Sequence, residues 1–107
     1  MAKLKVTKKS LAGTLESSDV LVEVSPAKSI SDSTISDSIS VEKDNRVEIE
    51  SVVLAQFGEA LERTVSDVLR QLGVTDAHVV LHDRGALDCV VRARVETALR
   101  RAGTEEG

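Results

Sequence analysis

The chain has 107 residues, a formal net charge of −4 and one cysteine. It is therefore long enough for one domain, and it offers neither a disulfide framework nor a cysteine-rich zinc site. The single Phe, with no Tyr or Trp, argues against base-stacking surfaces, and the mild acidity is not the footprint of a nucleic-acid binder. Because no apolar run reaches the length of a membrane span or a signal peptide, we expect a cytoplasmic protein that binds neither membranes nor nucleic acid.

The first elements along the chain are predicted to be an arm and a β-hairpin. Residues 1–9 carry four lysines and little apolar content, which predicts a flexible basic arm. Valines alternate at positions 20, 22 and 24, the period-two pattern of a half-buried strand. Residues 11–15 tolerate a strand, and small polar residues follow them. We therefore predict a hairpin whose tip is at Ser17–Asp19.

A serine-rich segment follows Pro26. The unit Ile-Ser-Asp-Ser occurs at Ile30–Ser33 and again at Ile35–Ser38. Such a segment cannot bury enough apolar surface to offset the entropy of ordering it. Residues 26–45 are therefore predicted to form a flexible loop, with residues 30–40 mobile and dispensable.

A strand and a long helix are predicted next. Residues 46–50 alternate between apolar and charged side chains, and Ser51 is a candidate N-cap for the segment that follows. Apolar residues then recur at spacings of three and four from Val53 to Leu72, which predicts an amphipathic helix. Gly73 stands where a left-handed residue would end that helix.

The last third predicts another strand and another helix. Residues 77–82 are mostly apolar and rich in valine, and a turn signal follows them. Apolar spacing from residue 87 to residue 102 predicts the second helix, with Asp88 as its candidate N-cap and Gly103 at its end. Residues 104–107 are expected to be a solvated tail.

Together these elements predict an α+β fold. Its small, mainly antiparallel sheet would consist of the β-hairpin and two further strands, packed by the two amphipathic helices. One domain would span residues 10–103 and include the serine-rich loop.

Neither histidines nor the cysteine predict a catalytic or metal site. His78 and His82 lie four apart in the predicted strand, roughly 13 Å from each other at the rise of a strand, which is too far for one zinc ion. Cys89 lies near the start of the second helix, but the sequence places no base beside it. We interpret Cys89 as a small core or boundary residue and keep a cysteine hydrolase as a minor alternative. We expect no catalytic residue and no metal ligand.

Three segments resemble one known family. They are AGTLESSDV (Ala12–Val20), QFGEALERTVSDVL (Gln56–Leu69) and HDRGALDCVVRARVE (His82–Glu96). In order and spacing they are similar to the acyl carrier protein, or gamma chain, of bacterial citrate lyase. The first and third segments are the specific ones, since the second is partly a generic amphipathic helix.

The resemblance implies an attachment site. In that family the hairpin-tip serine that follows Leu-Glu carries a CoA-like group, and this position is Ser17 here. The family usually reads Ser-Gly-Asp, whereas this chain reads Ser17-Ser18-Asp19. Ser18 is therefore an alternative acceptor. A protruding tip on a rigid base suits a serine that several active sites must reach.

The resemblance also implies a cofactor, partners and a role. The cofactor would be 2′-(5″-phosphoribosyl)-3′-dephospho-CoA, joined to the serine through a phosphodiester and holding an acetyl group on its thiol. The carrier would be non-catalytic. A cofactor-transfer enzyme would attach the group, the lyase alpha chain would exchange acetyl for citrate, and the beta chain would release oxaloacetate.

Two other functions remain open. The carrier subunit of malonate decarboxylase looks related and uses the same group. A small adaptor that binds protein partners would carry nothing covalent on Ser17.

Basic side chains are concentrated in the second predicted helix. Arg92, Arg94, Arg100 and Arg101 lie in it, with Arg84 just upstream. They form either a solvated face or contacts with partner chains and with the phosphates of the arm, because a guanidinium suits bidentate phosphate contact.

Overall fold

The computed structural model describes residues 3–27, 38–42, 45–51 and 54–106, and in it five strands precede the first helix. In chain order the elements are β1 (Lys3–Val6), β2 (Ser10–Gly13), β3 (Val20–Pro26), β4 (Ser38–Glu42), β5 (Asn45–Ser51), α1 (Leu54–Gln71), β6 (Ala77–Asp83), α2 (Asp88–Ala102) and β7 (Gly103–Glu106). Among the described residues, neither helix is long and apolar enough to cross a bilayer.

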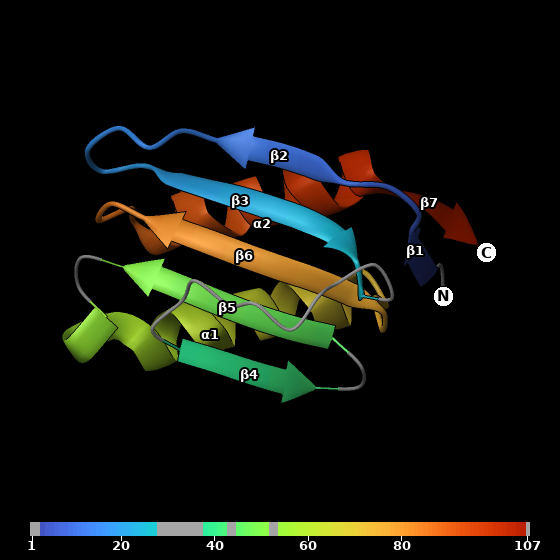
Figure 1. Cartoon of the computed structure of the whole chain (residues 1–107), viewed down its shortest axis with the longest axis horizontal. Helices are drawn as coiled ribbons and strands as arrows, with labels where there is room; N and C mark the ends of the chain where they lie inside the picture. The colour runs from blue at the N-terminus through green and yellow to red at the C-terminus, as the bar shows by residue number, and fades with distance from the viewer. Residues whose placement is uncertain (1–2, 28–37, 43–44, 52–53, 107) are drawn as a thin grey trace.

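One five-stranded sheet, in the order β2-β3-β6-β5-β4, forms the front layer in Figure 1. Strands β5 and β6 are parallel and are joined by helix α1, whereas the other three neighbouring pairs are antiparallel. Both helices cover the same face of the sheet, with α1 behind β5 and α2 behind β2 and β3. The predicted α+β fold with a mainly antiparallel sheet is confirmed.

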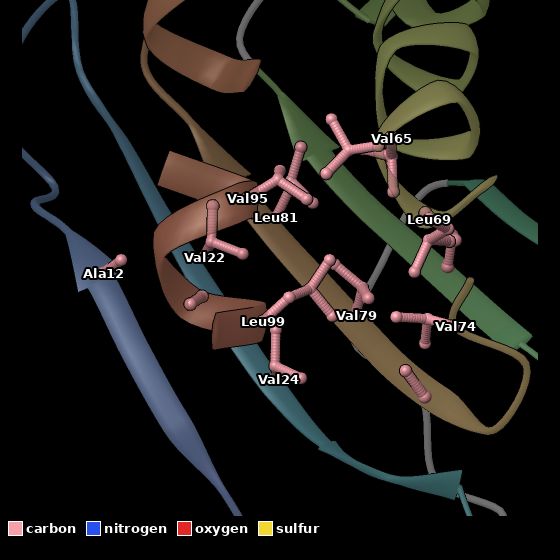
Figure 2. Close-up of a cluster of buried hydrophobic side chains, with 14 of the residues drawn as sticks. Ala12, Val22, Val24, Val65, Leu69, Val74, Val79, Leu81, Val95 and Leu99 are labelled. Atoms are coloured by element: carbon pink, nitrogen blue, oxygen red, sulfur yellow. The ribbon is translucent and has the colours of Figure 1, made fainter. Parts of the chain in front are cut away.

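The core lies between the sheet and the two helices, as Figure 2 shows. Val20, Val22 and Val24 of β3 are fully buried, so the predicted alternation points one face of the strand inward. From the helix side, Val95 and Leu99 of α2 are also fully buried. This apolar layer fixes the register of the sheet, because a slip of one residue would turn the valines outward.

The two ends of the described chain differ from the predicted arm and tail. Strand β1 pairs with β7 in a separate two-stranded sheet, in which Lys3 lies opposite Glu106. Leu4 and Val6 are buried, and the Leu4 N–H donates to the Leu72 carbonyl at 2.9 Å. Backbone pairing and these two apolar side chains therefore hold a segment that its lysines suggested was loose.

The predicted loop at residues 26–45 also differs in part. Pro26 is the last residue of β3, and residues 38–42 form β4, which pairs with β5. Residues 28–37 and 43–44 lie outside the described residues. Ladder hydrogen bonds along an edge of the sheet order the 38–42 segment even though its composition is that of a linker.

Helix α1 ends as predicted but does not begin as predicted. Gly73 adopts φ +67°, and the Val74 N–H donates to the Leu69 carbonyl, as in a left-handed helix end. Ser51 is not an N-cap, since it ends β5 and its hydroxyl donates to the Asp83 carboxylate at 2.8 Å.

Helix α2 differs from the prediction at both ends. Leu87 occupies its N-cap position, and Asp88 is the first helical residue and accepts a hydrogen bond from the Thr64 hydroxyl. Gly103 is extended and opens β7 rather than capping the helix. Asp88 stands one position past the N-cap, and its carboxylate accepts from Thr64 of α1.

Candidate functional site

The hairpin tip at residues 14–19 projects from one end of the sheet, where Ser17 and Ser18 are both exposed (Figure 1). Strands β2 and β3 pair from Ser10 opposite Val24 up to Gly13 opposite Leu21. At the top of the loop, the Asp19 N–H donates to the Glu16 carbonyl at 3.1 Å. The predicted hairpin and the place of its tip are confirmed.

The tip requires two left-handed residues. Gly13 has φ +93°, and a Cβ there would lie 1.8 Å from the Val20 carbonyl oxygen, so only glycine fits. Ser18 has φ +65°, a conformation in which glycine is favoured over an L residue. Position 18 therefore sets the backbone of the turn, and position 17 presents its side chain at the corner.

Asp19 holds the base of the tip through both carboxylate oxygens. Its Oδ1 accepts from the Val20 N–H at 2.7 Å, and its Oδ2 accepts from the Thr14 hydroxyl at 2.8 Å. Arg94 of α2 adds a fork, with Nε 3.3 Å from Oδ1 and Nη2 3.2 Å from Oδ2. The Val20 N–H, then Thr14, then Arg94 lower the pKa of Asp19, so its carboxylate is ionised near neutral pH.

The loop after β6 also supports the tip. The Ser18 N–H donates to the Arg84 carbonyl at 2.8 Å, and the Arg84 N–H donates to the Asp19 carbonyl at 2.9 Å. These two bonds place Ser18 and Asp19 opposite Arg84 and continue the pairing of β3 with β6, in which Val20 lies opposite Asp83. The loop after β6 and helix α2 thus fix the tip from two directions.

A pocket of about 370 Å³ opens beside this supporting loop. Among the residues whose side chains the structure describes, those that line it are Ala60, Leu61, Asp83, Gly85, Ala86, Leu87 and Asp88. Asp83 is buried, and its carboxylate accepts from the Ala86 N–H at 3.0 Å and from the Ser51 hydroxyl at 2.8 Å. These bonds hold the loop in one conformation, so the pocket has a defined wall.

The five arginines singled out in the sequence do not form one surface. Arg94 contacts Asp19 at the tip, and Arg101 donates to the Leu11 carbonyl of β2 at 3.0 Å. The other three form ion pairs within the chain: Arg84 with Glu50, Arg92 with Asp67 and Arg100 with Glu96. Contact of these residues with partner chains or with phosphates stays a prediction.

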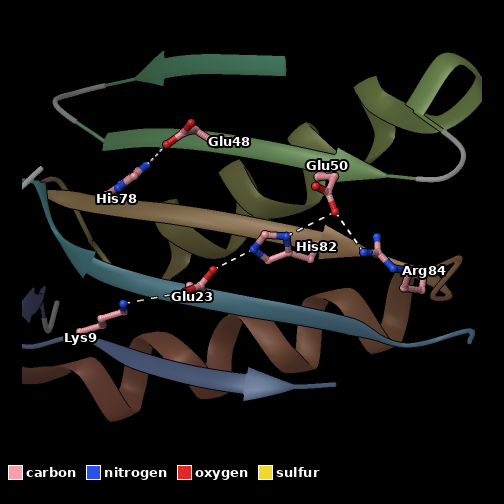
Figure 3. A network of polar contacts seen from close by, with 7 residues as sticks. All are labelled: Lys9, Glu23, Glu48, Glu50, His78, His82 and Arg84. Atoms are coloured by element: carbon pink, nitrogen blue, oxygen red, sulfur yellow. Dashed lines mark hydrogen bonds and ion pairs between the residues drawn. The ribbon is translucent and has the colours of Figure 1, made fainter. Parts of the chain in front are cut away.

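Both histidines lie in a polar network on the sheet face away from the helices (Figure 3). His78 pairs with Glu48, while His82 lies between two carboxylates, with Nε2 2.8 Å from Glu23 and Nδ1 3.5 Å from Glu50. Arg84 and then His82 lower the pKa of Glu50. Both imidazoles pair with carboxylates from the two strands that flank β6, so the network is a set of cross-strand pairs.

Cys89 is exposed in the first turn of α2, not in the core or at its boundary. The interpretation of Cys89 as a small packed residue is therefore wrong. The apolar spacing of α2 places Val91 and Val95 inward, which turns position 89 to solvent.

The site consists of the exposed Ser17 hydroxyl on a hairpin tip that hydrogen bonds hold in place. Ser17 was predicted from the sequence, as were its neighbours in the turn. The fork between Asp19 and Arg94 was not, since 75 positions separate the two residues. The sequence signal for this contact was the spacing of Arg94 and Arg101, which lie seven apart on one helix face and both contact the hairpin.

Comparison with known proteins points to acyl carrier proteins. The acyl carrier family described as malonate decarboxylase delta subunit (MdcD) matches residues 7–102. The citrate lyase acyl carrier protein of Haemophilus influenzae (strain PittEE) is 48% identical over 102 residues, covering 95% of this chain and 92% of the relative. That of Escherichia fergusonii is 44% identical with the same coverage, and that of Klebsiella pneumoniae is 46% identical over 96 residues, covering 90% and 86%.

A solved structure shares the fold. It is the Pseudomonas malonate decarboxylase hetero-tetramer in complex with malonate, one chain of which matches with a TM-score of 0.66 at 16% identity. The match covers 96% of this chain and 95% of that chain. The same arrangement of strands and helices is thus found in a chain of a decarboxylase assembly.

Proposed function

The chain belongs to the family of citrate lyase acyl carrier proteins, and from this membership we propose that it is the acyl carrier subunit of a cytoplasmic citrate lyase. Its role is to carry, not to catalyse. The exposed Ser17 at the corner of a tip held by Asp19 and by the loop after β6 is the observation that carries the proposal.

Ser17 is the proposed acceptor, with Ser18 as the alternative. The family's usual Ser-Gly-Asp places glycine at position 18, and φ +65° at Ser18 is the conformation that glycine favours. The left-handed backbone at position 18 accounts for that glycine. The hydroxyl that this chain shares with the family is therefore the one at position 17. Ser17 is exposed, so a phosphodiester can form on its Oγ without displacing a buried group.

The residues around Ser17 fit a phosphate-linked group. Arg94 is 41% exposed although it holds Asp19, so its guanidinium keeps accessible N–H donors near the tip. The negative charge of Asp19 opposes a phosphate at this position, and the positive charge of Arg94 offsets that of Asp19. The proposed cofactor is 2′-(5″-phosphoribosyl)-3′-dephospho-CoA, and when bound it supplies a terminal thiol that holds the acyl group.

The chain's own contribution is position. A rigid tip presents the arm to successive active sites, which replaces diffusion by a high effective concentration. The proposed partners are the lyase alpha and beta chains and the enzyme that transfers the cofactor.

Intact mass of the protein purified from its host tests the assignment. We expect an increase by one phosphoribosyl-dephospho-CoA unit, lost in Ser17→Ala and kept in Ser18→Ala. The second variant is a matched control, because it removes the neighbouring hydroxyl from the same exposed turn. An adduct kept in Ser17→Ala and lost in Ser18→Ala would move the site by one residue. An unmodified chain from cells with active lyase would refute the proposal.

The malonate decarboxylase carrier is the second candidate, because the family that matches residues 7–102 is described by that enzyme's delta subunit. Identities of 44–48% to citrate lyase carriers favour the first. Co-purification of the tagged chain distinguishes them: citrate cleavage in the isolated complex supports the lyase, whereas malonate decarboxylation supports the alternative. An adaptor without a covalent group would show no added mass.

A further inference from the structure

The pocket beside the tip has walls suited to an uncharged ligand. Ala60 and Leu61 of α1 form one side, and Ala86 and Leu87 form the other. Leu87 is 71% exposed, the largest exposure among the large apolar side chains that the structure describes. A volume of about 370 Å³ lies within the range of small-ligand sites. The exposed leucine at its mouth is apolar surface that an occupant would cover.

The pocket adjoins the proposed attachment site. Ser18 donates from its N–H to the Arg84 carbonyl at 2.8 Å, and the next residue after Arg84 is Gly85, which lines the pocket. The tip and the pocket wall are thus consecutive parts of one hydrogen-bonded structure. A chain attached at Ser17 reaches the pocket by passing over this loop.

The charged side chains at the tip differ in sign from those at the pocket. Arg94 lies at the tip, whereas Asp83 and Asp88 line the pocket. Asp83 is buried with its carboxylate occupied. Asp88 accepts from the Thr64 hydroxyl and lies 4.0 Å from Arg92 Nε, but its side chain is 66% exposed, so its two oxygens keep lone pairs that can accept a further hydrogen bond. A phosphate is favoured beside Arg94 and disfavoured in the pocket, while a neutral amide N–H is favoured beside Asp88.

We propose that this pocket binds the uncharged, amide-containing pantetheine segment of the arm attached at Ser17, as a resting position between visits to partner active sites. The proposal rests on the function proposed above. The occupant is the chain's own covalent group, because attachment at the adjoining tip keeps it at a high effective concentration. The apolar walls contact its methyl and methylene groups, and Asp88 accepts from an amide.

A pair of substitutions on exposed helix positions tests the proposal. Ala60→Phe places a ring in the pocket, whereas Ala93→Phe places the same ring on an exposed position of α2 outside the lining. Both variants keep Ser17. Each is prepared in the host with its covalent group, and intact mass establishes attachment.

Two readouts follow, and neither uses lyase activity. The first is the rate at which iodoacetamide alkylates the arm's thiol, compared with free CoA. Occupancy of the pocket for about two-thirds of the time slows the reaction roughly threefold in the unsubstituted chain and in Ala93→Phe. In Ala60→Phe the rate should equal that of CoA. The second readout is the NMR spectrum of the backbone amides. The amide signals of Leu61 and Leu87 should shift when the group is attached at Ser17, in every form except Ala60→Phe.

The outcomes separate the two proposals. An adduct on Ser17 whose thiol reacts at the rate of CoA, with unshifted Leu61 and Leu87 amides, overturns the pocket and leaves the carrier function standing. Equal protection in Ala60→Phe and Ala93→Phe also overturns it. Absence of any adduct on Ser17 overturns both.

Discussion

Replacing Ser18 by glycine should stabilise the protein, although glycine usually weakens a fold. Ser18 has φ +65°, a left-handed conformation that costs an L residue roughly 1–2 kcal/mol. Glycine avoids that cost but adds roughly 0.5–1 kcal/mol of chain entropy on folding. The midpoints of these two ranges differ by about 0.75 kcal/mol in favour of Ser18→Gly. For a domain of about this size, that is a rise in Tm of roughly 3–6 °C.

The matched control is Ser17→Gly. Among the described residues, Ser18 is the only non-glycine residue with positive φ, so glycine at position 17 relieves no strain. It should therefore destabilise by roughly 0.4–1 kcal/mol through the unfolded chain alone. The same substitution at neighbouring exposed positions thus has opposite expected signs.

Thermal and urea unfolding of the unmodified chain, followed by circular dichroism, measures both variants. A lower Tm for Ser18→Gly than for the parent would refute the left-handed turn. Equal losses in the two variants would refute it as well. Ser18→Gly should also accept the prosthetic group on Ser17, because it preserves the hydrogen bond from the backbone N–H of position 18 to Arg84.

Three further predictions concern the core, the tip and the serine-rich segment. Leu99→Ala, at a fully buried position of α2, should cost about 2–5 kcal/mol in urea unfolding, and a loss under 1 kcal/mol would contradict the packing. Because the pKa of Asp19 is lowered, its stabilising contribution is present above the ordinary carboxyl pKa and is lost as pH falls through the lowered value. Arg94→Leu should raise the titration midpoint of the Asp19 carboxyl, measured by NMR. An unchanged midpoint would count against the fork between Arg94 and Asp19. Shortening residues 28–37 by half should change stability by only about 0.6 kcal/mol, whereas deleting residues 38–42 removes β4 and should lower Tm clearly; equal effects would show that β4 contributes nothing.

Local patterns predicted the elements that carry their own signal. The alternating valines at 20, 22 and 24 located β3, and Gly73 located the end of α1. Ser51 and Asp88 misled because their side chains are engaged by Asp83 and Thr64, from elements distant in sequence. A capping preference is local, and such tertiary partners override it.

The missed strands share a cause. Strand β4 lies in a serine-rich segment without core-forming composition, and β1 and β7 pair across about the whole length of the chain. Edge pairing depends on where the partner strand lies, which composition does not contain. At the site, Ser17 followed from the turn residues and the resemblance, but the fork from Arg94 to Asp19 depends on the packing of α2 against the hairpin.

The pairing of β1 with β7 has a practical consequence for handling the protein. Lys3 lies opposite Glu106, and β1 and β7 lie at the end of the molecule away from the hairpin tip (Figure 1). A fusion partner or a surface tether attached at either terminus therefore leaves the proposed acceptor, Ser17, accessible. A short peptide could also join the two ends, so circular permutants with new termini elsewhere are accessible without disturbing the tip.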